Sequence, residues 1–126
     1  MKALSSFAAA LLLSMSLTAG SAQATTAREL LPSCDAALRS LHGSGEDVSI
    51  APAGRVCWTY MQAVQDMAAL ADEGGHRLLN ICLPENGRTD GVLRAFTKYA
   101  HAHPRQLNSR ASVVALQGLG AAFPCK

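Results

Sequence analysis

The hydrophobic positions of this chain recur with helical spacing, most strongly across residues 53–71. Apolar residues there follow one another every three or four positions, which places them on one side of a helix in a stripe wide enough to face a core. The stripe is predicted to consist of Val56, Tyr60, Ala63, Val64, Met67 and Ala71. Pro52 precedes this segment and Gly74-Gly75 follow it, as is typical of the two ends of a helix. We therefore expect residues 53–71 to form the central helix of the fold.

A first helix is predicted over about residues 28–41, ahead of the central one. It has Pro32 in its first turn, where the missing backbone N–H does little harm. Its apolar stripe, which we expect to face the core, consists of Leu30, Cys34, Leu38 and Leu41.

Two more helices are predicted in the C-terminal half. The earlier one begins near Thr89, an N-cap residue followed by an acid, and ends at His103-Pro104. It is expected to bury Val92, Phe96 and Tyr99, and the later helix, over about residues 109–122, to bury Val113, Leu116 and Phe123. Gly118 and Gly120 in the last helix indicate either a close approach to a neighbour or a weak final turn.

The segments between these helices differ in character. Residues 42–52 are polar and rich in glycine, which predicts an exposed loop. Residues 78–84 are a short apolar run, which we interpret as a buried turn or brief helix; a strand is the alternative, but no second segment is present to pair with it. The predicted fold class is therefore all-α, a small disulfide-stapled helical bundle of four main helices.

The N-terminus has the pattern of a secretory signal peptide. One basic residue, Lys2, precedes an apolar run from Phe7 to Leu17, and small residues at Ala22 and Ala24 suit a cleavage site after residue 24. A membrane anchor is the weaker alternative, because the run is shorter than the roughly 20 residues that a spanning helix needs. We predict a signal peptide over residues 1–24, a single helical domain over residues 25–126, a periplasmic location and no membrane association after cleavage.

All four cysteines follow the predicted cleavage site, and an even number in a small exported domain favours two disulfides. Free-thiol chemistry is disfavoured, since no Cys-x-x-Cys pair or zinc-type spacing is present. If the first two helices form an antiparallel hairpin, Cys34 and Cys57 lie at similar distances from its loop, offset by roughly 4.5 Å. Cys82 precedes the third helix and Cys125 follows the fourth, so both should lie at one end of a second hairpin. We predict the pairs Cys34 with Cys57 and Cys82 with Cys125.

Charge and candidate chemistry exclude several classes of function. The basic residues are scattered and the net charge is only +2, so no nucleic-acid partner is expected. His101 and His103 are two residues apart and do not match the four-residue spacing of a helical zinc pair. Asp66 has no obvious second acid, and we expect it to cap a backbone group or to meet an arginine. Trp58 is predicted at the edge of the core or in an interface. We expect no enzyme activity, no metal and no cofactor.

With these elements placed, the chain resembles the Rap/Tai family, the immunity proteins of type VI secretion amidase effectors. Members share a first-helix Cys, a Cys-x-Gly-Tyr with a later Gly and Asp, a Cys-x-Pro, a helix ending in Tyr-Leu-x-x-His-Pro, and a closing Ala-Phe-Pro-Cys. Thr59, Ala63 and Ala100 depart from the pattern. Besides the four cysteines, the matching positions are Tyr60, Asp66, Pro84, Tyr99, His103, Pro104, Phe123 and Pro124.

The resemblance implies an all-helical, disulfide-bonded periplasmic protein, often a homodimer, that binds a secreted peptidoglycan amidase and blocks its active-site cleft. A rigid, disulfide-stapled scaffold suits tight inhibition because its loops are already ordered before the partner binds, so binding carries no ordering cost. We expect the partner-binding loops at residues 43–50 and 84–88, with the candidate residues Ser44, Glu46, Asp47, Glu85, Asn86 and Arg88. Alternatives are a periplasmic stress protein similar to HdeA-type acid chaperones, or a family member that has taken another role.

Overall fold

The computed structural model describes residues 23–41, 49–86 and 88–126. These residues form four α-helices: α1 (Ala27–Leu41), α2 (Arg55–Ala68), α3 (Thr89–Ala102) and α4 (Ala111–Ala122), with short 3-10 turns at Pro52–Gly54 and Pro104–Gln106. Within the described ranges there is no β-strand, only three isolated bridges. The all-α prediction is confirmed. The predicted signal peptide lies almost entirely outside these ranges, as do the candidate residues Ser44, Glu46 and Asp47.

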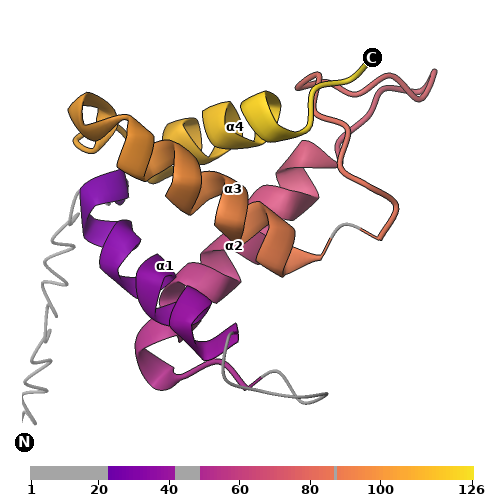
Figure 1. Cartoon of the computed structure of the whole chain (residues 1–126). Helices are drawn as coiled ribbons and strands as arrows, with labels where there is room; N and C mark the ends of the chain where they lie inside the picture. Colours follow the sequence, from indigo (N-terminus) through magenta and orange to yellow (C-terminus); the bar gives the residue numbers. More distant parts are fainter. Residues whose placement is uncertain (1–22, 42–48, 87) are drawn as a thin grey trace, which may run out of the picture.

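Helix α3 lies at the centre of the bundle and packs against all three other helices (Figure 1). Its core positions include Leu93, Phe96 and Ala100, none of which retains any solvent exposure. The predicted burial of Val92 and Phe96 is confirmed, and Tyr99 is partly buried. The sequence-based choice of residues 53–71 as the central helix is wrong, because α2 covers one side of α3 while α4 covers another.

The predicted inward face of α2 is confirmed at Val64 and in part at Tyr60, and is wrong at its other positions. Its core residues are Cys57, Met61, Val64 and Ala68, whereas Val56 is 67% exposed and Ala63, Met67 and Ala71 also face solvent. The reason is that α2 has apolar residues on two adjacent faces, and spacing alone does not choose between them. The face with Cys57 is turned inward, where the disulfide joins it to α1.

The buried face of α4 is likewise shifted by one residue position from the face predicted from the sequence. Val113 is exposed, Leu116 and Phe123 are only partly buried, and the buried residues are Ala111, Val114, Ala115, Gly118 and Leu119. Gly118 explains the rotation, since a Cβ at that position would lie 3.0 Å from the carbonyl oxygen of Ala95 and 3.0 Å from Tyr99 Cβ. The close approach predicted from the glycines therefore holds for Gly118. At Gly120 a Cβ would meet nothing within 4 Å.

Helix α1 begins with a capping box. The carboxylate of Glu29 accepts hydrogen bonds from the backbone N–H of Thr26 at 2.8 Å and from its hydroxyl at 2.9 Å, and the Thr26 hydroxyl accepts one from the Glu29 N–H at 3.3 Å. The bonds from Thr26 hold the pKa of Glu29 below its ordinary value of 4.5. Pro32 lies inside α1, not in its first turn as predicted, with its ring on the exposed side.

Both predicted disulfides are confirmed. Cys34–Cys57 is fully buried between α1 and α2, and Cys82–Cys125, at the surface, ties the start of the loop before α3 to the C-terminus. Next to the first bridge, the Ser33 hydroxyl donates to the Ala53 carbonyl at 2.7 Å and accepts from the Cys57 N–H at 3.1 Å. A residue of α1 thus caps the first turn of α2, whose own N-cap, Gly54, has no side chain for this purpose.

Candidate functional site: a projecting hairpin and the adjoining groove

The most distinctive surface lies where α2 ends, α3 begins and the chain terminates. Between α2 and α3 the backbone forms a hairpin that projects beyond the end of α2, beside the C-terminus (Figure 1). We refer to residues 70–79 as the projecting hairpin. An isolated bridge between Ala71 and Arg77 marks its two arms, and the Leu78 N–H donates to the Leu70 carbonyl at 3.1 Å.

The tip of the projecting hairpin is held by a compact set of hydrogen bonds around Asp72. The Asp72 N–H donates to the His76 carbonyl at 3.0 Å, and the Asp72 carbonyl accepts from the Gly75 N–H at 3.0 Å. The Asp72 carboxylate accepts from the His76 N–H at 2.8 Å and also contacts the His76 ring. Gly75 has a φ of +82°, the left-handed conformation that glycine adopts without a steric penalty. The tip therefore has a defined turn.

The base of the hairpin is anchored to the rest of the molecule. Ile81 is buried and forms an isolated bridge with Pro124, while the Cys82 N–H donates to the Phe123 carbonyl at 2.9 Å. The Arg77 guanidinium donates to the Ala69 carbonyl at the end of α2. With the Cys82–Cys125 disulfide one residue beyond Ile81, the hairpin is fastened to both α2 and the C-terminal segment.

Three leucines of the hairpin face solvent. Leu70 is 53% exposed, Leu78 61% and Leu79 41%. The prediction that residues 78–84 form a buried turn or brief helix is wrong for Leu78 and Leu79, because the hairpin extends past the helices that could cover them. Ile81 is buried and Leu83 is partly buried against the core. Exposed leucines on an ordered projection make this segment a candidate for contact with another protein.

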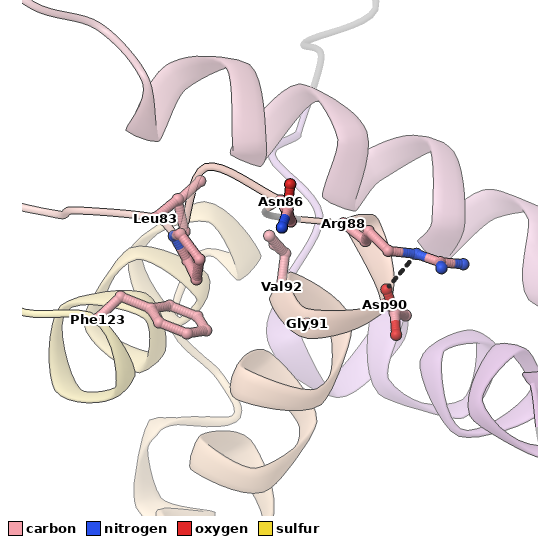
Figure 2. Close-up of a pocket in the computed structure, with 8 residues that line it drawn as sticks. Leu83, Asn86, Arg88, Asp90, Gly91, Val92 and Phe123 are labelled. Atoms are coloured by element: carbon pink, nitrogen blue, oxygen red, sulfur yellow. Dashed lines mark ion pairs between the residues drawn. The ribbon is translucent and has the colours of Figure 1, made fainter.

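A groove opens next to the base of the hairpin, with a volume of about 240 Å³. Figure 2 shows Leu83 and Phe123 on one side and Arg88 with Asp90 on the other, where the two charged groups form an ion pair at 3.4 Å. Val92 also lines the groove. Its remaining lining residues are Pro84, Asn86 and Gly91.

The loop predicted from the sequence to bind a partner borders this groove. Glu85, Asn86 and Arg88 are all exposed, and Asn86 and Arg88 line the hollow itself. The role of these residues in binding stays a prediction, and the sequence analysis did not single out the exposed leucines of the hairpin. The signal that could have found them is the Gly74-Gly75 pair between two short apolar runs, a pattern that favours a β-hairpin turn over a simple helix end.

The histidines and the acid that the sequence analysis considered for metal binding or catalysis do not come together in a site. His101 on α3 contacts Asp35 on α1 at 3.0 Å, and His103 stacks on Tyr99 with ring centroids 3.9 Å apart. Among the described residues no group of three potential metal ligands comes together. Asp66 is exposed and, within the described part of the chain, its carboxylate has neither the backbone cap nor the arginine partner that was expected.

The four helices, both disulfides and the residues that line the groove all lie between residues 26 and 125. The family model of the Rap1a immunity proteins matches residues 26–125, and the chain belongs to this family. Membership implies an immunity protein directed against a type VI secretion effector, a class that generally acts without catalysis. No curated protein and no solved structure matches the chain. In the described ranges no helix is long and apolar enough to cross a membrane.

Proposed function

We propose that this protein is exported by its N-terminal signal peptide, folds in the periplasm and neutralises a type VI secretion peptidoglycan amidase by binding it. The observation that carries the proposal is the family match over residues 26–125, which covers the bundle and both disulfides. Two disulfides in a chain of 126 residues suit an oxidising compartment, where a cell-wall amidase would also act. The protein acts by occupancy and catalyses no reaction.

The projecting hairpin and the adjoining groove are the surface that we assign to the effector. The hairpin is convex, so it suits a concave site such as the cleft of an enzyme. Leu78 and Leu79 supply the apolar contact, and Asp72 and His76 at the tip supply a polar rim. Because hydrogen bonds and a disulfide already order this segment, binding costs little further conformational entropy.

Protection of bacteria from a periplasmic amidase tests the proposal. A panel of type VI peptidoglycan amidases is directed to the periplasm with or without the full chain, and lysis is followed as loss of optical density. We expect the chain to prevent lysis by at least one amidase and to co-purify with it. If the correctly exported protein neutralises and binds none of them, the amidase assignment is wrong.

The exposed leucines also favour one second function, that of an acid-stress chaperone similar to the HdeA type, since such surfaces bind unfolded chains. This alternative predicts that the purified protein suppresses aggregation of unrelated periplasmic proteins at low pH. The immunity proposal predicts no such general activity. Light scattering of an acid-shocked test protein, with and without this chain, separates the two.

A further inference from the structure

The base of the projecting hairpin meets the C-terminal segment along a short seam, by which we mean residues 80–82 together with residues 123–125. The Cys82 N–H donates to the Phe123 carbonyl at 2.9 Å, and the Cys125 N–H donates to the Asn80 carbonyl at 3.4 Å. The Cys82–Cys125 disulfide is the covalent link across the seam, with its two Cα atoms 4.9 Å apart.

Solvent reaches this disulfide and does not reach the other one. Cys82 is exposed and Cys125 is half-buried, whereas Cys34 and Cys57 retain no exposure. Thiol–disulfide exchange requires a thiolate to reach one of the two sulfur atoms, so access selects the bridge that is reduced first. A reductant added to the folded protein therefore meets the bridge of the seam.

Opening this bridge is expected to leave the helical core in place. Both of its cysteines lie outside the helices, because α3 begins at Thr89 and α4 ends at Ala122. The other bridge, by contrast, joins α1 to α2 inside the core. Without the bridge, the seam keeps its backbone hydrogen bonds, and hydrogen bonds that water can replace contribute little by themselves. The two segments of the seam should therefore separate while the bundle stays folded.

The seam supports both parts of the surface that we assign to the effector. Leu78 and Leu79 come directly before it in the chain. Phe123, which belongs to the seam, lines the groove on the same side as Leu83 (Figure 2). Separation of the two segments would withdraw Phe123 from the groove and free the base of the hairpin from the C-terminal segment.

We propose that Cys82–Cys125 is a redox switch for this binding surface: the closed bridge holds the hairpin and the groove in their binding geometry, and reduction by a dithiol of the thioredoxin class releases them. The link to the effector rests on the proposed function, whereas the opening of the seam does not.

The chemistry of the switch is thiol–disulfide exchange. A thiolate of the dithiol attacks the exposed Cys82 Sγ, and the Cys125 sulfur leaves as a thiolate that takes up a proton from water. The second thiolate of the reductant then displaces the Cys82 sulfur, which is protonated in turn. The reductant supplies both electrons and ends as a disulfide, and its two thiol protons pass to the solvent.

Hydrogen exchange measured by NMR tests the opening of the seam. Two open forms are compared with the oxidised protein: wild type treated with dithiothreitol until alkylation finds only Cys82 and Cys125 released, and the double variant Cys82→Ser, Cys125→Ser, which needs no reductant. We expect the amides at positions 82 and 125 to exchange at least about tenfold faster in both open forms, with the amides of α1 and α2 unchanged. The same brief treatment should not change the double variant, because it lacks the bridge.

Inhibition of a bound amidase gives the functional readout. The double variant, assayed without reductant, should inhibit at least about tenfold more weakly than the oxidised wild type, and reduced wild type should regain full inhibition after reoxidation. Amides of the seam that exchange no faster, a double variant that loses its helices by circular dichroism, or full inhibition by the double variant would overturn the inference. The exchange measurement contains no amidase, so it decides the opening of the seam even if the oxidised wild type inhibits none.

Discussion

Single residues set the distances between the helices of this small bundle. Gly54 shows this most clearly: a Cβ added there would lie 2.6 Å from the Cα and 2.7 Å from the N of Ala37 on α1. Backbone atoms cannot move aside as a flexible side chain can. The absence of a side chain at Gly54 therefore allows the start of α2 to meet α1 beside the buried disulfide.

Replacing Gly54 by alanine should destabilise the protein by about 2 kcal/mol, the usual cost of overpacking a tight contact. The matched control is Gly120→Ala in α4, where a Cβ meets nothing within 4 Å. Alanine is the better helix former, so this control should gain about 0.5–1 kcal/mol. Urea unfolding monitored by the fluorescence of Trp58, the single tryptophan, measures both changes. Equal effects at the two glycines would contradict this account of Gly54.

Glu29 gives the α1 capping box a pH dependence of known sign. Its folded-state pKa is lowered by the hydrogen bonds from Thr26, so its contribution to stability is complete above the ordinary value of 4.5 and disappears as the pH falls through the lower folded value. The advantage of wild type over Glu29→Gln should therefore be constant near neutral pH and shrink under acid conditions. Unfolding curves at a series of pH values measure it, and an advantage that grows on acidification would contradict the capping role.

At the scale of elements, the two disulfides have different surroundings. Cys34 and Cys57 are fully buried, whereas Cys82 is exposed and Cys125 half-buried. A thiol reductant under native conditions should therefore open Cys82–Cys125 first and leave Cys34–Cys57 closed. Alkylation of the released thiols at successive times, followed by peptide mass spectrometry, gives the order. Earlier release of Cys34–Cys57 would contradict the difference in burial between the two bridges.

Each bridge closes a long loop, with 23 residues of separation for the first and 43 for the second. On the chain-entropy account each contributes about 3 to 4 kcal/mol, comparable to the net stability of a small domain. Full reduction is therefore expected to unfold the protein.

The helices and disulfide pairs could be predicted from the sequence, but the rotation of two helices could not. The positions of Cys34 and Cys57 relative to their shared loop favour this pair over the alternatives, because helix rise converts sequence distance into length. The inward face of α2 depends instead on a choice between two apolar stripes, and that of α4 on the contact of Gly118 with α3. Both are tertiary effects, which local spacing does not contain.

Part of the candidate site could likewise be predicted from the sequence, and part could not. Exposure of Glu85, Asn86 and Arg88 follows from their polar character and the nearby proline, and the structure places them beside the groove. Exposure of Leu78 and Leu79 runs against their hydrophobicity, and sequence patterns assign such residues to the core. These leucines become candidates for binding a partner only because the structure shows that the hairpin projects beyond the bundle (Figure 1).

At the scale of the whole molecule, α3 packs against the three other helices, and the buried disulfide joins α1 to α2. The projecting hairpin lies at one end of this bundle, fastened by the second disulfide (Figure 1).

The central claim is that the projecting hairpin neutralises a peptidoglycan amidase. It is tested most directly by titrating a purified, bound amidase with wild-type protein and with the Leu78→Asp, Leu79→Asp double variant, following release of peptide from peptidoglycan. Both side chains are exposed, so the variant should fold normally, which circular dichroism verifies; Val113→Asp on α4 is the matched control. We predict stoichiometric inhibition by wild type and by the control, and inhibition at least a hundredfold weaker for the double variant, as expected when two buried interface anchors become charged. Full inhibition by the folded double variant would contradict the account.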